Sequence, residues 1–262
     1  MKKVIAHLSD LHFGRIDPAT LDPLVCAIED LRPDLIAVSG DLTQRARRRE
    51  FEDARQFLDR LHGPMIVVPG NHDVPLRNPW TRFISKWDRF REHIHGDLDQ
   101  TYTDEAMVVV GINTARALSW KRGRINAEQI ENVHRAFTAA APDVLRVLVA
   151  HHPLDIPVDW PGSNRAKHAR RALERWAECG VDLILAGHAH KAFASGDAAS
   201  LHIGNHNAVI VQAGTATSTR GRGEPNSFNA IHVSAQQIRV TRLTWRHDEQ
   251  RFVETHEDKF ER

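Results

Sequence analysis

Seven short apolar runs recur along the chain, separated by longer stretches of mixed polarity. The runs are Val4–Leu8, Leu35–Ser39, Met65–Val68, Met107–Ile112, Leu145–Ala150, Leu183–Ala186 and Val209–Gln212. They are mainly hydrophobic and rich in β-branched residues, which is typical of strands buried on both faces rather than half exposed. The pattern therefore predicts a core built around β-sheet.

Most of the stretches between these runs have helical periodicity. Between Arg45 and Leu61, apolar residues such as Phe51 recur at spacings of three and four, which gives one apolar helical face. Further helices are expected over Asp22–Leu31, Thr81–Ile94, Ala127–Ala140 and Lys167–Cys179. The last stretch, Ile231–Trp245, alternates apolar and polar residues and predicts strands or a hairpin with one polar face.

Strands that alternate with helices, followed by a β-rich tail, predict an α/β sandwich with mixed sheets. The chain has 262 residues, which is long enough to bury a substantial core. It contains no internal repeat, low-complexity segment or long linker. A single domain over residues 1–262 is therefore the simplest expectation.

Polar clusters follow five of the apolar runs, in each case directly after the run ends. They read Ser9-Asp10-Leu11-His12, Gly40-Asp41, Gly70-Asn71-His72-Asp73, His151-His152 and Gly187-His188-Ala189-His190. One such cluster alone would suit a turn, because Asp and Asn are common turn formers. In open α/β sheets, however, ligands bind at the carboxyl ends of the strands, so five clusters in this position are expected to converge on one site.

The residue types in the clusters indicate metal chemistry. Asp, Asn and His without Cys form a ligand set suited to Mn, Fe, Zn or Co. The Asp10-x-His12 and His188-x-His190 spacings let two side chains on one face of an extended segment approach the same ion. Two metals about 3.5–4 Å apart need a bridging carboxylate, and together they activate water and clamp a phosphoryl group. The sequence therefore predicts a two-metal hydrolytic centre.

Composition and charge narrow the choice of partners. The chain is 41% hydrophobic and 26% charged, as in an ordinary globular protein. Its 35 Lys and Arg residues balance 34 Asp and Glu residues, so no global basic field points to nucleic acid or to an anionic membrane. A small phosphoester substrate is the expected partner, and a homodimer is one candidate for the oligomeric state.

The expected compartment is the cytoplasm. Cys26 and Cys179 lie far apart and form neither a disulfide framework nor a zinc knuckle, which favours a reducing environment. The basic start of the chain resembles a signal peptide, but its apolar run is broken by His7 and Asp10 and is too short. No stretch has the roughly 18 apolar residues of a membrane span.

Taken together, the five clusters resemble the motifs of the calcineurin-like binuclear metallophosphoesterases, in order and spacing, from residue 10 to residue 190. The Gly70-Asn-His-Asp, Thr114-Ala-Arg and Asn226-Ser-Phe-Asn stretches are most similar to the bacterial class III cyclic-nucleotide and glycerophosphodiester phosphodiesterases. This resemblance implies a four-layer α/β/β/α sandwich of two mixed β-sheets flanked by helices.

The resemblance also implies a role for each motif residue. Asp10, His12 and His190 would hold the first metal, and Asp41 would bridge both. Asn71, His151 and His188 would hold the second metal. His151 is preferred because it follows its strand directly, with His152 as the alternative. His72 would bind no metal; with Asn71 it would contact the substrate, and its imidazole would stabilise charge on the phosphoryl oxygens or protonate the leaving group.

The sequence departs from one branch of the family at Gln44. The protein Ser/Thr phosphatases carry a second aspartate at this position, three residues after the bridging one, and that aspartate supports the catalytic histidine. Gln44 therefore argues against this branch and leaves the partner of His72 open, with Asp73 as a candidate. His7 has no counterpart in the motifs and is expected to face the interior or a neighbouring strand.

The expected activity is hydrolysis of small phosphodiesters, either cyclic nucleotides or glycerophosphodiesters, by attack of a metal-bridging hydroxide. A phosphomonoesterase or a nucleotide pyrophosphatase would use the same core. A nuclease is disfavoured because no basic stripe is visible. A non-catalytic scaffold is disfavoured because all seven predicted ligands and His72 are present.

Loop arginines offer further candidate contacts to substrate phosphates. They are Arg122, Arg124, Arg220 and Arg222. The sequence does not decide whether they contact the substrate or solvent. The basic run Arg45–Arg49 is expected to be a solvated helical face rather than a phosphate-binding patch.

Overall fold

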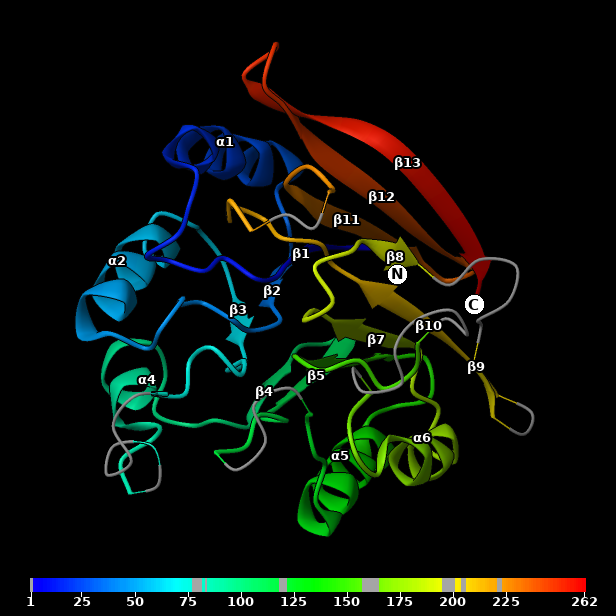
Figure 1. The fold of residues 1–262 in the computed structure, drawn as a ribbon. Coiled ribbons are helices and arrows are strands. Elements are labelled where there is room, and N and C mark those ends of the chain that lie inside the picture. The colour runs from blue at the N-terminus through cyan, green and yellow to red at the C-terminus, as the bar shows by residue number, and fades with distance from the viewer. Residues whose placement is uncertain are drawn as a thin grey trace.

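The computed structural model describes residues 2–76, 82, 84–117, 122–156, 165–194, 201–203, 206–220 and 223–262. Two β-sheets lie face to face, with helices on their outer sides (Figure 1). The first sheet has the strand order β13-β12-β11-β1-β2-β3. Its strands are β1 (Lys2–Leu8), β2 (Leu35–Val38), β3 (Met65–Val67), β11 (Ser227–Ser234), β12 (Gln237–Arg246) and β13 (Arg251–Glu261).

The second sheet has the order β4-β5-β6-β7-β10-β8, with β9 paired to β10. Its strands are β4 (Gln100–Thr103), β5 (Met107–Ile112), β6 (Leu145–Ala150), β7 (Leu183–Ala186), β8 (Phe193–Ala194), β9 (Leu201–Ile203) and β10 (His206–Gln212). Both sheets are mixed: β1 is parallel to β2 but antiparallel to β11, and β5 is parallel to β6 but antiparallel to β4. All seven apolar runs are therefore strands, as predicted.

Alternation along the strands divides the core into three layers. In β1, Ile5 packs with Val109 and Leu185 of the other sheet. The neighbouring Ala6 and Leu8 point the opposite way, into the layer under helices α1 (Leu21–Leu31) and α2 (Arg48–Leu58). Helices α5 (Ala127–Ala139) and α6 (Ala169–Ala177) cover the outer face of the second sheet. The predicted four-layer α/β/β/α sandwich is confirmed.

Helix α2 begins three residues later than the periodicity predicted. The Glu50 carboxylate accepts hydrogen bonds from the backbone N–H groups of Arg45, at 2.7 Å, and Arg47, at 3.2 Å. These N–H groups are thereby held outside the helix, and the first helical residue is Arg48. The arginines of the 45–49 run are exposed, as expected of a solvated face.

Other predicted elements differ in length or were missed. The helix expected over Thr81–Ile94 is observed as the short α4 (Asp88–His93), and residues 77–81 and 83 lie outside the described residues. Strand β13 was not predicted, because it is an edge strand whose residues are mostly charged and exposed. The short β4 was missed for a similar reason, since only Gln100 in it is buried.

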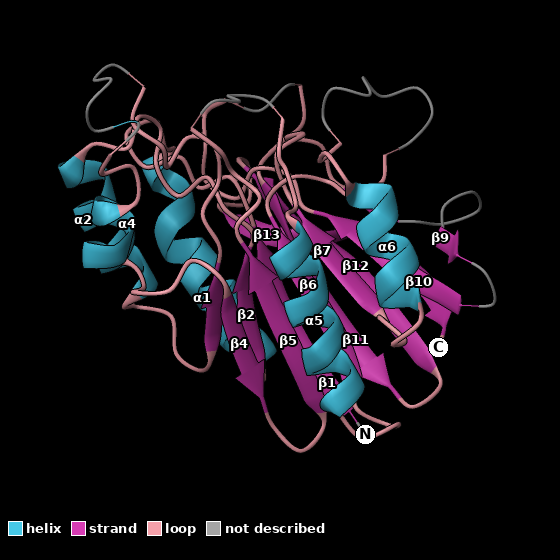
Figure 2. Cartoon of the chain, turned by 90° about the horizontal axis from the view of Figure 1, so that it is seen from below, coloured by secondary structure: helices cyan, strands magenta, loops and turns pink. Residues whose placement is uncertain are grey.

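The loops after β1, β2, β3, β6 and β7 gather at one edge of the two sheets (Figure 2). Backbone hydrogen bonds hold these loops together across sequence. The N–H groups of Asp10 and His12 donate to the carbonyls of Gly40 and Asp41, at 3.0 and 2.9 Å. The N–H of Gly187 donates to the carbonyl of His151, at 3.0 Å. The five polar clusters therefore meet at this edge.

Among the residues with a described placement, no helix is long and apolar enough to cross a membrane.

Candidate metal centre

Backbone strain is concentrated in the polar clusters. Nine non-glycine residues have positive φ angles in the described part of the chain, and five of them belong to the clusters. These five are Asp10 (53°), His12 (52°), Asp41 (53°), His188 (76°) and His190 (58°). Such a conformation costs about 1 kcal/mol or more per residue and persists where the surroundings enforce it. The turns that carry the predicted ligands are therefore held in an unfavourable backbone conformation.

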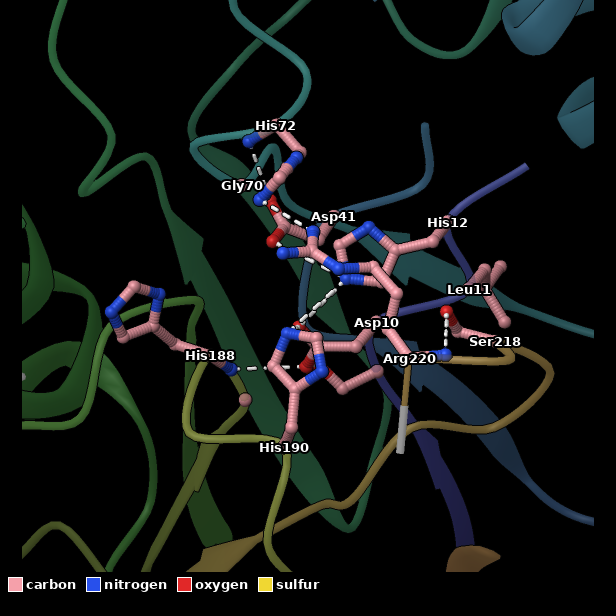
Figure 3. Close-up of polar contacts among 12 residues, drawn as sticks. Asp10, Leu11, His12, Asp41, Gly70, His72, His188, His190, Ser218 and Arg220 are labelled. Atoms are coloured by element: carbon pink, nitrogen blue, oxygen red, sulfur yellow. Dashed lines mark hydrogen bonds and ion pairs between the residues drawn. The ribbon is translucent and has the colours of Figure 1, made fainter. Parts of the chain in front are cut away.

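The first group of donors consists of Asp10, His12 and His190 (Figure 3). Asp10 Oδ1 lies 3.3 Å from His190 Nε2 and 3.5 Å from His12 Nε2. The two imidazole nitrogens are 3.3 Å from each other. The other carboxylate oxygen, Asp10 Oδ2, accepts hydrogen bonds from Ser9 Oγ and from the His188 N–H. Asp10 is thus fixed through one oxygen while the other faces the two imidazoles.

The second group of donors consists of Asn71, His151 and His188. Asn71 Oδ1 lies 3.1 Å from His151 Nε2 and 2.9 Å from His188 Nδ1. The two histidine nitrogens are 3.3 Å apart. His151 Nδ1 is 2.8 Å from the carbonyl oxygen of Ser39, which can only accept a hydrogen bond. The proton of a neutral His151 ring is therefore on Nδ1, and the lone pair of Nε2 is directed at the group.

Asp41 lies between the two groups. Its Oδ2 is 3.4 Å from His151 Nε2 of the second group and 3.8 Å from His12 Nε2 of the first. Its Oδ1 accepts a hydrogen bond from the backbone N–H of His72 at 2.7 Å. One carboxylate oxygen is therefore oriented by the backbone, and the other is shared by the two groups.

The spacing of these atoms fits two metal ions. Ligand atoms held about 2.0–2.2 Å from one ion lie roughly 3–3.5 Å from each other. Asp10 Oδ1 is buried and accepts no hydrogen bond from any residue that the structure describes. Nitrogen lone pairs and carboxylate oxygens directed at a common point are the arrangement that a cation stabilises. The two clustered donor groups therefore indicate a dimetal centre.

The charges in the centre also suit cations. Burial raises the pKa of Asp10 and of Asp41, but neighbouring imidazoles outweigh it and hold both pKa values below the usual range. Burial lowers the pKa of His151, but the carboxylates of Asp41 and Asp10 reverse this and raise it to about 9. Burial and the nearby His151 lower the pKa of His188 to about 3. Both carboxylates are thus anionic at neutral pH, and a bound cation would displace the His151 proton.

His152, the alternative to His151, lies beside the second group. Its ring centroid is 4.5 Å from that of His188, and its Nδ1 is 2.8 Å from Thr114 Oγ1. His152 Nε2 is buried with no hydrogen-bond partner among the described residues. His151, by contrast, has its Nε2 close to both Asn71 and Asp41. His151 therefore has the closer contacts with the other predicted donors, while the ligand atoms of His152, His151 and His188 all lie within 4.8 Å of one another.

Two glycines leave space that the donors occupy. A Cβ atom on Gly70 would lie 2.2 Å from Asp41 Oδ1. A Cβ atom on Gly187 would lie 1.8 Å from Ser9 Oγ and 2.8 Å from Asp10 Oδ2. Both distances are far below a van der Waals contact, so the close approach of the loops depends on glycine at these positions.

His72 stands beside the first group, with its ring centroid 4.8 Å from that of His12. Its Nδ1 lies 2.9 Å from the carbonyl oxygen of Gln44. Asp73, the candidate partner from the sequence, binds elsewhere: its carboxylate accepts hydrogen bonds from the N–H groups of Thr43 and Gly70. The observed ring partner is therefore the Gln44 carbonyl rather than Asp73. Sequence reasoning missed it because a backbone carbonyl carries no residue-type signal.

The four loop arginines differ in position. Arg220 is half buried, and its Nη1 lies 3.1 Å from His72 Nε2. Arg122 and Arg124 are exposed, and Arg222 lies outside the described residues. His7 is buried between the sheets, with Nε2 2.9 Å from Ser39 Oγ of the neighbouring strand end, which agrees with the expectation for it.

The chain is similar in sequence to curated enzymes. A protein named probable cyclic nucleotide phosphodiesterase, from Synechococcus sp., is 27% identical over 214 residues, which cover 76% of this chain and 78% of that protein. The glycerophosphodiester phosphodiesterase GpdQ of Enterobacter lignolyticus is 40% identical over 81 residues, which are only 27% of this chain and 29% of that protein.

The fold is similar to that of a solved phosphatase, and the motifs match a family model. The purple acid phosphatase PPD1 from yellow lupin seeds has a TM-score of 0.74 at 12% identity, covering 100% of this chain and 54% of that one. The family model described as calcineurin-like phosphoesterase matches residues 3–192, a range that includes all five polar clusters. The chain therefore belongs to the calcineurin-like phosphoesterase family.

Proposed function

We propose that this protein is a two-metal phosphodiesterase that hydrolyses small phosphodiesters, with cyclic nucleotides and glycerophosphodiesters as the candidate substrates. The observation that carries the proposal is the position of Asp41 Oδ2, within 3.4 Å of one donor group and 3.8 Å of the other. The names of the two relatives, a cyclic nucleotide and a glycerophosphodiester phosphodiesterase, support the choice of diesters.

In this proposal, each donor group binds one ion. Asp10, His12 and His190 would hold the first ion, Asn71, His151 and His188 would hold the second, and Asp41 would serve both. The ions, when bound, activate a water molecule for attack on phosphorus and neutralise charge on the phosphoryl oxygens. The donor types support Mn, Fe, Zn or Co as the ions that would bind.

The chain's own residues would orient the substrate and exclude water. The Asn71 amide belongs to the second group and the His72 ring lies beside the first, so both would contact a phosphoryl group bound across the two groups. Holding the phosphorus in line with the attacking oxygen lowers the entropic part of the barrier. A general acid or a charge-stabilising group at the leaving oxygen lowers it further.

A substrate panel tests the proposal. Metal-stripped protein would be reloaded separately with Mn, Fe, Zn or Co and assayed on bis-p-nitrophenyl phosphate, p-nitrophenyl phosphate, cyclic AMP and a glycerophosphodiester. We expect the diesters to be hydrolysed faster than the monoester with at least one metal. A monoester rate far above every diester rate would replace the proposal with a phosphomonoesterase, and no turnover with any metal would favour a scaffold.

A further inference from the structure

The hydrogen bonds of His72 determine which of its ring nitrogens carries the proton. Nδ1 lies 2.9 Å from the carbonyl oxygen of Gln44, and a carbonyl can only accept. The Gln44 side-chain nitrogen also approaches Nδ1, but at the longer distance of 3.3 Å. The neutral ring therefore carries its proton on Nδ1 and a lone pair on Nε2.

The group facing that lone pair is Arg220. Its Nη1 lies 3.1 Å from His72 Nε2 (Figure 3). The same nitrogen lies 3.5 Å from Gln44 Oε1. A guanidinium group has only donors and stays protonated in proteins, so Nε2 accepts the hydrogen bond. In this arrangement His72 has no N–H left for a phosphoryl oxygen. The N–H groups at this position belong to Arg220.

The backbone before Arg220 is attached to the loop that carries the first donor group. The N–H of Ala216 donates to the carbonyl of Ser9 at 3.0 Å, and Thr217 Oγ1 donates to the carbonyl of Leu11 at 2.7 Å. The N–H of Arg220 in turn donates to Ser218 Oγ at 3.1 Å. The first two bonds lie on either side of Asp10 and directly before His12. The backbone of Arg220 is therefore held close to the first donor group, and the contacts of Nη1 with His72 and Gln44 orient its guanidinium.

Resting on the proposed function, we infer that Arg220 is the residue that donates hydrogen bonds to the phosphoryl and leaving-group oxygens, and that His72 is its positioning residue. A water-derived hydroxide forms the new P–O bond while the bond to the leaving oxygen breaks. The electron pair of that bond stays on the leaving oxygen, and Arg220 stabilises the charge without giving up a proton. A solvent water then protonates the alkoxide. Of the two roles that the sequence suggests for His72, charge stabilisation thereby passes to Arg220, and His72 itself donates no proton.

Variants of Arg220 should differ from the wild type in kcat and in their response to added guanidinium ion. In the metal-loaded enzyme, Arg220→Ala should lower kcat on bis-p-nitrophenyl phosphate about 100-fold, as the loss of a transition-state donor does elsewhere. Added guanidinium ion should restore part of the rate, which a purely structural role would not allow. Arg220→Lys should retain more activity than Arg220→Ala, because it keeps the charge. Metal content and melting temperature should match those of the wild type.

Arg239→Ala serves as the control, because Arg239 forms an ion pair with Glu257 on the terminal strands. It should change kcat less than twofold and should not respond to guanidinium. An Arg220→Ala variant that folds, binds metal and keeps more than a third of the wild-type kcat would overturn the inference. So would a loss that guanidinium does not restore at all.

A second readout does not depend on turnover. In zinc-loaded protein labelled with ¹⁵N-histidine, two-bond ¹H–¹⁵N spectra distinguish the two neutral tautomers, and the His72→Gln variant identifies the His72 signals. We expect the Nδ1–H tautomer, with an Nε2 shift that changes in Arg220→Ala. An Nε2–H tautomer would contradict the inference and favour His72 as the proton donor. If the tautomer agrees but no phosphoester is hydrolysed, the proposed function fails while the Arg220–His72 contact stands.

Discussion

At the scale of single residues, the candidate metal centre depends on side chains that are each held in place by several contacts. Asp10 and Asp41 each have one oxygen fixed by hydrogen bonds and the other facing imidazole nitrogens. Both residues also have positive φ angles. The conformational strain of these positive φ angles is compensated by the hydrogen bonds and packing that the turns make possible. A bound cation would stabilise the folded turns further.

Gly187 gives a direct test of this tight arrangement. In Gly187→Ala, the new methyl group would collide with Ser9 Oγ and approach Asp10 Oδ2. We expect the free energy of unfolding to fall by about 1–3 kcal/mol, with loss of most activity, because the fully buried side chains of Ser9 and Asp10 have no room to move. Urea denaturation and metal analysis would measure both effects. Gly96→Ala is the control, because a Cβ at Gly96 would have nothing within 4 Å; equal effects in the two variants would contradict the account.

At the scale of elements, the sequence pattern identified the buried strands well and the edges poorly. The apolar run of β2 (Leu35–Val38) is fully buried as a strand, as its β-branched, uninterrupted pattern predicted, and the polar cluster after it marks the site. In contrast, β13 has an exposed face and few apolar residues, so periodicity alone did not reveal it. The start of α2 was misplaced because the capping contacts of Glu50 are not visible in the hydrophobic pattern.

Glu50 is expected to stabilise α2 through these contacts. Its carboxylate is 5% exposed and accepts two backbone hydrogen bonds, so removing it leaves N–H groups without an acceptor. Glu50→Ala should lower the free energy of unfolding by about 1–3 kcal/mol. The exposed Glu52, which pairs with Arg48, is the matched control, and Glu52→Ala should cost less than about 1 kcal/mol. Similar urea midpoints for both variants would show that the cap is unimportant.

At the scale of the whole molecule, the convergence of five loops from two sheets was predictable, but the contacts between them were not. The position of each polar cluster after a strand predicted that Asp10, Asp41 and His151 would meet. The role of the Gln44 carbonyl and the place of Arg220 depend on how the last loop packs against the first. Such contacts between distant segments have no local signature, so the sequence left them open.

Asp104 links the two sheets and should make stability depend on pH. Its carboxylate binds Lys3 of β1 at 2.8 Å and accepts hydrogen bonds from the N–H groups of Ala106 and Met107. Burial raises the pKa of Asp104, but these partners outweigh it and hold the pKa below the usual range. A carboxyl whose pKa is lowered by folding stabilises the protein above its unfolded pKa, near 4, and loses this as pH falls through the folded value.

We therefore expect Asp104→Asn to lower the free energy of unfolding at pH 7 by about 1–2 kcal/mol. The difference from the wild type should shrink as the pH falls from about 5 towards 3, because the unfolded wild-type chain then takes up a proton at Asp104 that the folded protein, with its lowered pKa, does not yet bind. Urea denaturation of both proteins across this range gives the comparison. A difference that stays constant down to pH 3 would show that the charge of Asp104 contributes nothing.

Metal stoichiometry measured together with turnover shows whether two ions share Asp41. Metal-stripped protein would be titrated with Mn²⁺ or Zn²⁺ while bound metal and hydrolysis of bis-p-nitrophenyl phosphate are followed together. We predict that activity is absent in the stripped protein and reaches its maximum near two ions per chain. Asp41→Asn should bind fewer ions and lose turnover, whereas Asp59→Asn on the exposed end of α2 should behave like the wild type. Full activity in thoroughly chelated protein, or a plateau at one ion per chain, would contradict the account.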